Sequence, residues 1–203
     1  SINGDDQRGD GSELAPWKTI AKAFAYYAGR PTPGDAIRIK AGVYRESFWI
    51  RSSGTKENPI IIGPYGDGEV IIDASIKVEN WAVYKEKIFM AKCPFKPTAI
   101  VLDGKMLFPE FPLSKIEQNK WYYDEKGKVI YVYTPDGKSP DKHSLGAIKN
   151  DEGQNGIFIN NAHYIILYGL TVRFSGGHGI SVLGDNNRIE KCSIEFNGKG
   201  GIS

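Results

Sequence analysis

The last third of the chain repeats itself at a fixed interval, and this repeat constrains the fold more than any other feature. The segment GIFINNAHYIILYGLTVRFSGGHGIS begins at Gly156, and HGISVLGDNNRIEKCSIEFNGKGGIS begins 22 residues later at His178. Repeats of roughly 20–50 residues are typical of solenoids, propellers and arrays. One loop is a residue longer, because Gly156–Ile157 precedes Gly179–Ile180 by 23. The pairs that stand 22 apart are Tyr164 and Asn186, Leu167 and Ile189, Leu170 and Cys192, Val172 and Ile194, and Phe174 and Phe196.

Each repeat unit contains three short β-type runs separated by Gly, Asn and Asp, and no helical stretch fits inside it. The Leu-x-x-Leu-x-Leu frame of leucine-rich repeats is missing as well. Three short strands per turn of chain describe a parallel β-helix, whose coils stack ~4.8 Å apart. We therefore expect Leu167 to lie on Ile189 and Phe174 on Phe196. A shift of one residue inside a strand would turn its inward side chains outward, which confines insertions to the turns.

The N-terminal third predicts a capping helix followed by strands. The helix is expected to begin within 15–20, with Pro16 in the first turn where its missing N–H is harmless, and to end at Gly29. An amphipathic helix can cover the hydrophobic end of the first coil. Its apolar face consists of Trp17, Ile20, Ala21, Phe24 and Ala28. The expected strands cover residues 36–40, 47–50, 59–62 and 70–73, with turns at 33–35, 41–42, 52–55 and 65–68.

Residues 78–150 interrupt the regular rhythm. A four-residue loop separates Trp121–Tyr123 from Val129–Tyr133, which predicts a β-hairpin, and 100–107 predicts a second one. The predicted fold class is all-β, a parallel β-helix with an N-terminal capping α-helix and a small antiparallel β-hairpin insertion. The expected domains are the cap and first coils in 1–77, the hairpin insertion in 78–150 and the regular 22-residue coils in 151–203.

Several short elements carry a resemblance to a known family. They are Trp17–Ile20, Pro33–Asp35, Ala41–Glu46, Ser53–Thr55 and Asn58–Ile60. With them the chain resembles the N-terminal cap and first coils of secreted right-handed parallel β-helix proteins. These proteins include the pectate-lyase-like superfamily, and among its members the chondroitinase B and alginate lyase type. Residues 121–140 resemble an insertion in bacterial β-helix proteins related to glycoside hydrolases and lyases.

The resemblance implies a right-handed coil, an extracellular location and a polysaccharide partner. In such families the catalytic residues usually lie on middle coils, which would follow residue 203, so no catalytic residue is assigned here. We expect the N-terminal part of a secreted carbohydrate-active protein related to polysaccharide lyases or glycoside hydrolases. The alternative is a non-catalytic β-helix for carbohydrate binding, surface attachment or self-assembly. Because the chain stops one strand into a new coil at 201–203, we expect either a fragment or self-association through an open C-terminal end.

The charge balance excludes a strongly charged partner. Lysine and arginine number 26 against 24 acidic residues, which is too even to predict binding to nucleic acid or to a membrane surface. No apolar run approaches the ~18 residues that span a bilayer. Of the two cysteines, Cys93 and Cys192, the second falls on an inward repeat position, which favours a buried reduced thiol over a disulfide.

Basic residues on the regular coils are the candidates for binding sugar. A polysaccharide lyase needs a cation to neutralise the uronate and a base to remove the adjacent proton. His178 and Lys199 lie in glycine-rich turns, and we take them, with Arg188, as candidate substrate-binding residues. The structural alternative is that these glycines serve turn geometry alone. Arg173 stands 22 residues before Glu195, so this pair is expected to form an outward ion pair with a structural role.

Acidic residues give weaker signals. A glycoside hydrolase needs two carboxyls about 5–10 Å apart, but exposed acids on stacked coils meet that distance by accident. The available acids are Asp185, Glu190 and Glu195. The opening 3–12 has the hard oxygen ligands that Ca²⁺ prefers, but it lacks the EF-hand frame. A turn-forming terminus is therefore favoured, Ca²⁺ is left open as a cofactor, and the metal ligands stay unassigned.

Aromatic residues crowd the predicted hairpin. Aromatic faces bind the apolar C–H surface of sugar rings, but they also pack hairpins onto cores. Core packing is the favoured interpretation, and strand alternation would turn only half of the rings outward. The residues concerned are Trp121, Tyr122, Tyr123, Tyr131 and Tyr133.

Overall fold

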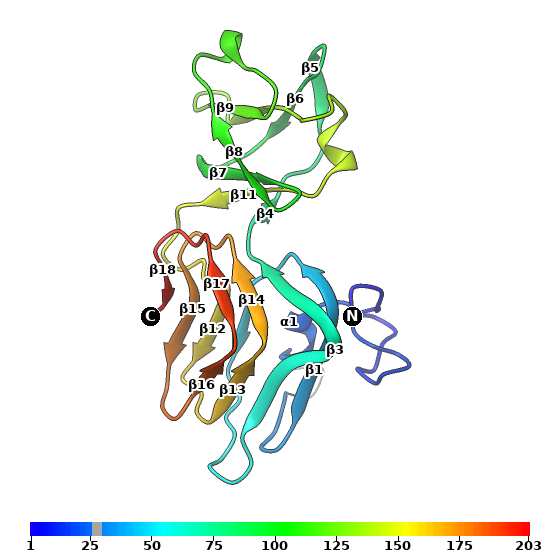
Figure 1. Cartoon of the computed structure of the whole chain (residues 1–203), viewed down its shortest axis with the longest axis vertical. Helices are drawn as coiled ribbons and strands as arrows, with labels where there is room; N and C mark the ends of the chain where they lie inside the picture. The colour runs from blue at the N-terminus through cyan, green and yellow to red at the C-terminus, as the bar shows by residue number, and fades with distance from the viewer. Residues whose placement is uncertain (26–29) are drawn as a thin grey trace. The chain divides into compact units, whose positions relative to one another are not determined.

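The computed structural model describes residues 1–25 and 30–203 and divides the chain into two compact units. The first unit joins Ser1–Ala74 to Glu152–Ser203, and the second is Ser75–Asp151. Figure 1 shows curled parallel sheets in the first unit and short, mainly antiparallel strands in the second. Over the described residues the chain is all-β apart from short helical turns.

The strands of the first unit form three parallel ladders, which we number in the order in which the chain visits them. The first ladder combines the first halves of β1 (Ala36–Tyr44) and β3 (Ile60–Asp73) with β13 (Ile165–Tyr168) and β16 (Arg188–Glu190). The second combines their second halves with β14 (Leu170–Arg173) and β17 (Ser193–Glu195). The third consists of β2 (Phe48–Ile50), β12 (Ile157–Asn160), β15 (His178–Leu183) and β18 (Gly200–Ile202). Each coil therefore adds one strand to every ladder.

The register of the ladders confirms the repeat spacing. Leu167 pairs with Ile189 and Val172 with Ile194, both 22 residues apart. Ile157 pairs with Ile180, at the expected spacing of 23. The prediction that a turn at 65–68 separates two strands was wrong. β3 runs through it because β1 pairs with both of its halves, with a register shift between Lys40 and Gly42.

Residues with positive φ mark the corners between the ladders. Before β13 and β16 these are Tyr164 (φ 55°) and Asn186 (φ 59°). Between the first and second ladders stand Gly169 (φ 64°) and Lys191 (φ 52°). The left-handed conformation turns the backbone sharply, which lets the chain leave one ladder and enter the next. The corners thus repeat with the same period as the strands.

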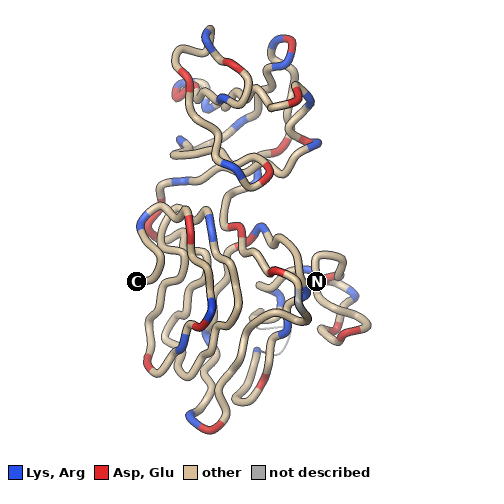
Figure 2. The backbone as a smooth tube through the Cα atoms, in the orientation of Figure 1, with Lys and Arg blue, Asp and Glu red and all other residues tan. Residues whose placement is uncertain are grey.

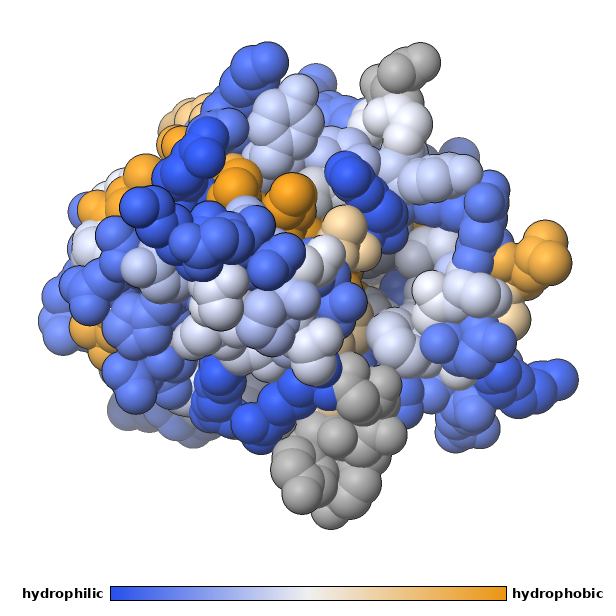
Figure 3. Space-filling view, turned by 90° about the horizontal axis from the view of Figure 1, so that it is seen from below, coloured by the Kyte–Doolittle hydropathy of each residue, from blue (hydrophilic) through white to orange (hydrophobic). Residues whose placement is uncertain are grey.

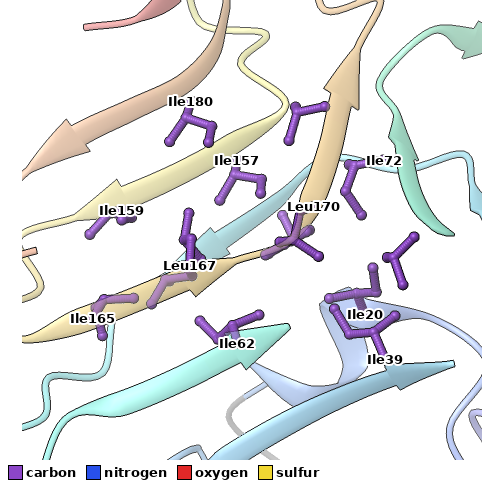
Figure 4. Close-up of a cluster of buried hydrophobic side chains, with 14 of the residues drawn as sticks. Ile20, Ile39, Ile62, Ile72, Ile157, Ile159, Ile165, Leu167, Leu170 and Ile180 are labelled. Atoms are coloured by element: carbon purple, nitrogen blue, oxygen red, sulfur yellow. The ribbon is translucent and has the colours of Figure 1, made fainter. Parts of the chain in front are cut away.

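Aliphatic side chains fill the space between the ladders. Figure 4 shows residues from several strands converging on one interior, among them Ile62, Leu167 and Ile180. These three side chains are fully buried. Each buried aliphatic side chain contributes roughly 1.5–3 kcal/mol relative to an exposed one, so the columns of stacked residues hold the coils together. Cys192 packs against this core as a free thiol, as its inward position predicted.

The capping helix α1 (Ile20–Ala23) is much shorter than the sequence predicted. The helix begins at Ile20, within the expected 15–20, but the prediction that Pro16 lies in its first turn was wrong, because Asp6 Oδ1 accepts hydrogen bonds from the backbone N–H groups of Lys18 and Thr19 before the helix begins. Thr19 is the N-cap, with its Oγ1 accepting from Lys22 N. The expected positions Ala28 and Gly29 lie outside the described residues. Ile20 still enters the core, and α1 packs against β1 and β2.

The second unit is a sheet of short strands with its own core. In spatial order its strands are β4 (Ile76–Lys77), β11 (Leu145–Lys149), β7 (Pro97–Leu102), β8 (Lys105–Pro109), β9 (Lys120–Asp124), β10 (Val129–Tyr133), β6 (Ile88–Lys92) and β5 (Ala82–Lys85). Both predicted hairpins, β7–β8 and β9–β10, are confirmed as antiparallel pairs. Short 3₁₀ turns occur at Leu113–Lys115 and Pro140–Lys142. In the sequence the unit interrupts one coil, between β3 of the second ladder and β12 of the third.

Candidate functional site

The outer face of the second ladder carries a column of alternating charge. Ile72, Val172 and Ile194 point into the core, so the residue after each of them points outward. The outward residues are Asp73, Arg173 and Glu195, and the register pairs Asp73 with Arg173 and Arg173 with Glu195. In the first coil the guanidinium of Arg45 lies 3.8 Å from the carboxylate of Asp73. We call Arg45, Asp73, Arg173 and Glu195 the charge column.

The charge column is partly withdrawn from solvent. Asp73 is only 1% exposed, and a buried carboxylate needs partners such as Arg45 to offset its desolvation. Nε of Arg173 is buried and has no hydrogen-bond partner within the described residues. An unsatisfied buried donor costs about 1–3 kcal/mol. Nε of Arg173 therefore carries a desolvation cost that no hydrogen bond within the described residues offsets.

The predicted ion pair between Arg173 and Glu195 was wrong. The two residues are in register, as their 22-residue spacing required. However, the guanidinium of Arg173 lies over the ring of Phe174, with its Cζ 4.9 Å from the ring centroid. No ion pair joins Arg173 to Glu195 among the described residues. The carboxylate of Glu195 is therefore left without its expected partner.

A second outward column stands beside the first. Thr171 lies two residues before Arg173 on the same face, and its Oγ1 donates a hydrogen bond of 2.9 Å to Glu69. Ser193 pairs with Thr171 in the next coil and is exposed. The face thus combines three carboxylates, two guanidinium groups and two hydroxyls. Such groups can donate to and accept from the hydroxyls of a sugar.

The spacing of the carboxylates has chemical meaning. Asp73 and Glu195 are two coils apart, which places their backbones roughly 10 Å from each other. Inverting glycosidases hold an acid and a base about 6.5–9.5 Å apart, so that a water molecule fits beside the scissile bond. The backbone separation of roughly 10 Å lies just above that range. The sequence alone missed Asp73 and Glu69, because their coil is joined to the later ones only across the 75–151 insertion.

The predicted sugar-binding residues His178 and Lys199 lie in one neighbourhood of the third ladder. Nζ of Lys199 forms an ion pair with Glu152. The hydrogen bond and charge of Lys199, and then the charge of His178, hold the pKa of Glu152 below its ordinary value. The ring of His178 lies beside Gly200 of the next coil, and its Nδ1 is buried without a hydrogen-bond partner in the described residues. Sequence reasoning missed Glu152, which completes this group.

Arg188 does not join the other two predicted residues. It lies on β16 in the first ladder, whereas His178 is on β15 in the third. Its Nε donates a 2.7 Å hydrogen bond to Glu190, two residues away on the same strand. Of the other acids that the sequence offered, Asp185 lies 3.5 Å from the ring of His163.

The acidic opening segment is occupied by its own backbone. Asp5 Oδ1 accepts from the N–H groups of Gln7 and Arg8, and Asp10 Oδ1 accepts from Ser12 N. Across residues 1–25 and 30–203, no group of three His, Cys, Asp or Glu side chains is arranged to hold a metal ion. These carboxylates therefore form turns, as the favoured interpretation of the sequence expected.

The second unit contains a histidine held by two carboxylates. His143 Nδ1 lies 2.7 Å from Asp103 Oδ2, and its Nε2 lies 3.0 Å from Asp136 Oδ1. Desolvation lowers the pKa of His143, but the hydrogen bonds and charges of the two carboxylates outweigh it, so the pKa lies above its ordinary value. Both ring nitrogens are engaged, which suits a structural clamp better than a catalytic base. Sequence reasoning missed this clamp.

Charged residues of both signs are mixed over the part of the chain that the structure describes. Figure 2 shows basic and acidic residues interspersed along the backbone. On the face seen in Figure 3, hydrophobic side chains form small groups among hydrophilic ones. No helix in the described part of the chain has the length and apolar character needed to cross a membrane.

Comparison with known proteins gives matches only among solved structures. No family model matches the chain. No curated protein matches it either. The structure of XylC in complex with xylose matches 93% of this chain with a TM-score of 0.63 and 15% identity. A structure described as a glycoside hydrolase matches 99% with a TM-score of 0.57 and 12% identity.

A third match is the GH136 lacto-N-biosidase from Eubacterium ramulus, over 99% of this chain, with a TM-score of 0.52 and 16% identity. The likeness establishes the fold. At these coverages the matches include the second unit as well as the ladders. The chain spans 39%, 62% and 28% of the three matched chains, which is less than two thirds of each.

Proposed function

We propose that this chain forms the first coils of a right-handed parallel β-helix in an extracellular carbohydrate-active protein, and that the protein is a glycoside hydrolase. The observation that carries the proposal is the likeness to three structures whose descriptions name xylose, a glycoside hydrolase and a lacto-N-biosidase. The likeness extends over the interrupted coil and its inserted unit. The resemblance to secreted β-helix proteins supports the extracellular location.

The charge column is the proposed sugar-binding face. Glu195 supplies a carboxyl that can act as acid or base in hydrolysis, whereas the buried carboxylate of Asp73 holds Arg45. Arg173 lies between Asp73 and Glu195 in the register. A polysaccharide lyase instead needs a base beside a neutralised uronate. The carboxyl-rich face therefore favours hydrolysis over elimination.

Calorimetry with the full chain tests this proposal. The ligands are neutral oligosaccharides of xylose, of glucose and of galactose with N-acetylglucosamine, together with acidic oligosaccharides of uronate. We expect a neutral ligand to bind and Glu195→Gln to weaken that binding about tenfold, the size of one hydrogen bond to a charged group. Glu117→Gln, which changes an exposed acid of the second unit, is the control. Equal binding by wild type and Glu195→Gln would contradict the assignment of this face.

Product analysis separates the remaining alternatives. New reducing ends without ultraviolet absorbance indicate hydrolysis, whereas absorbance of an unsaturated product indicates a lyase. Binding without any product supports the second candidate, a non-catalytic β-helix for carbohydrate attachment or self-assembly.

A further inference from the structure

Four aromatic rings form a continuous row on the second unit. The alternation of β9 and β10 turns Tyr122 and Tyr131 outward, and these two residues are direct cross-strand partners. Their ring centroids are 6.1 Å apart. Phe111 extends the row beyond Tyr122 at 5.8 Å, and Tyr84 of β5 extends it beyond Tyr131 at 4.8 Å. We call Phe111, Tyr122, Tyr131 and Tyr84 the aromatic row.

The aromatic row does not serve the core of its unit. The opposite face of the same hairpin supplies the core, where Trp121 is 4% and Tyr123 7% exposed. Phe111 is 64% and Tyr84 48% exposed. Large rings that remain in water while others fill the core mark a surface that binds something. The sequence predicted that half of the hairpin rings would face outward, and this is confirmed.

Polar groups accompany the rings along the row. At its Phe111 end lies a hollow of about 400 Å³, whose walls include Phe111 and Tyr122. The same hollow is lined by two cations and two anions, with Lys96 and Glu125 joined at 3.2 Å. The other charges are Asp124 and Lys126. The hollow is therefore neutral overall but rich in donors and acceptors.

We propose that the aromatic row and its adjoining hollow bind a neutral oligosaccharide. A sugar ring has an apolar C–H face and a rim of hydroxyls, and this pattern matches aromatic faces flanked by phenol hydroxyls and charged groups. Successive rings are 4.8–6.1 Å apart and their planes are inclined by 44–75°, so the row offers ring faces and ring edges in turn to a ligand that repeats along its length. The balanced charges of the hollow favour a neutral glycan over an acidic one. The choice of a sugar rests on the proposed function, whereas the row belongs to the other unit and requires no catalysis.

Binding measurements on the full chain test this inference. The probes are hexasaccharides of xylose and of glucose, titrated by calorimetry. We expect Tyr122→Ala and Phe111→Ala each to weaken binding about threefold to tenfold, which corresponds to the loss of one ring contact. Tyr168→Ala is the matched control, because Tyr168 is also a surface tyrosine, 38% exposed, but lies on the first ladder. Unchanged unfolding midpoints would show that the exposed-ring variants remain folded.

The outcomes distinguish this inference from the proposed function. Weaker binding in Tyr122→Ala and Phe111→Ala, with wild-type affinity in Tyr168→Ala, supports the aromatic row. If Glu195→Gln alone weakens binding, the row is overturned while the charge column stands. If neither hexasaccharide binds to the wild-type chain, the row as a neutral-sugar site is overturned. The neutral-sugar site is also overturned if Phe111→Ala disperses self-associated chains and leaves sugar binding unchanged, because the row is then a contact between protein chains.

Discussion

Phe174 stacks on Phe196 at equivalent corners of two successive coils, with ring centroids 5.9 Å apart and planes inclined by 23°. Both residues have positive φ, 62° and 54°. An aromatic residue pays a conformational cost in this region, which the stacked contact offsets. The pair differs in burial, since Phe174 is 1% exposed and Phe196 is 62% exposed.

The first prediction follows from that difference in burial. We expect Phe174→Ala to lower the free energy of unfolding by about 3–5 kcal/mol, because it opens a cavity in a closed site. Phe196→Ala is expected to cost about 1 kcal/mol, because its ring gains little from burial. Urea unfolding of both variants measures the two losses. Equal losses of unfolding free energy in the two variants would contradict the difference in burial between the two rings.

The second prediction concerns the corner between the first and second ladders. This corner is occupied by Lys191 in one coil and by Gly169 in the coil before it. Lys191→Gly removes a left-handed penalty of about 1–2 kcal/mol. It also removes a contact of the ammonium with the Tyr168 ring, 5.4 Å away, worth about 0.5–1 kcal/mol at an exposed site. The net expectation is a gain of about 0.5–1 kcal/mol, measured by urea unfolding.

The reverse change at the preceding corner is the control. Gly169→Ala places a Cβ in the left-handed region and 3.3 Å from Pro64, so it is expected to destabilise the chain. Lys149→Gly, within strand β11, should also destabilise, by about 0.5–1 kcal/mol. A loss of stability in Lys191→Gly comparable to that in Lys149→Gly would show that the corner carries no conformational penalty.

The parts of the fold that follow the fixed period could be predicted from the sequence. The stacking of Val172 on Ile194, for example, follows from the 22-residue spacing and from strand alternation alone. The short α1 could not be predicted, because its first backbone N–H groups are held by the carboxylate of Glu46, 26 residues beyond Ile20. The preference of Arg173 for the Phe174 ring depends on a corner conformation that no spacing reveals.

The candidate sites divide in the same way. Lys199 and His178 were found because glycine-rich turns repeat with the coils. Asp73 was missed, since its partner Arg173 lies 100 residues away across the insertion. His143 and Asp103 are 40 residues apart and meet only once the sheet of the second unit has formed.

The clamp around His143 provides the third prediction, a dependence of stability on pH. Because the folded-state pKa of His143 is raised, its contribution is fully present below the ordinary value of about 6.5 and is lost as pH rises through the folded-state pKa. The pKa of Asp103 is lowered despite its desolvation, by the hydrogen bond from Ser144 N and by His143. The contribution of Asp103 is therefore lost only in acid, as pH falls below about 4.

Thermal unfolding between pH 5.5 and 8.5 measures this effect. We expect the wild-type midpoint to fall as pH rises through the upper part of that range. The variant His143→Gln should lose most of this slope, because its amide does not titrate. His163→Gln, which changes an exposed histidine of the first unit, is the control and should retain the slope. A titration of the His143 ring by NMR with a midpoint below 6.5 would contradict the clamp.

The last prediction concerns asparagine side chains that bridge successive coils. Oδ1 of Asn197 accepts a 3.0 Å hydrogen bond from the backbone N–H of Ser175, one coil earlier, and its Nδ2 donates to Val172 O at 3.3 Å. Asn187 makes the equivalent pair of bonds at another corner, to Ile165 N and Ala162 O. At such corners the ladder pairing lapses, so the amide replaces the missing backbone partners.

Substitutions at Asn197 separate its donor from its acceptor. Asn197→Ala leaves both backbone groups unpaired and should cost about 1–3 kcal/mol in urea unfolding. Asn197→Asp keeps the acceptor for Ser175 N but puts a carboxylate oxygen against Val172 O in a partly buried site, so it should cost at least as much as Asn197→Ala. Asn160→Ala, on the outer face of β12, is the control and should be nearly neutral. If Asn197→Ala were as neutral as Asn160→Ala, the two hydrogen bonds of Asn197 would contribute nothing, and another account of the corner would be needed.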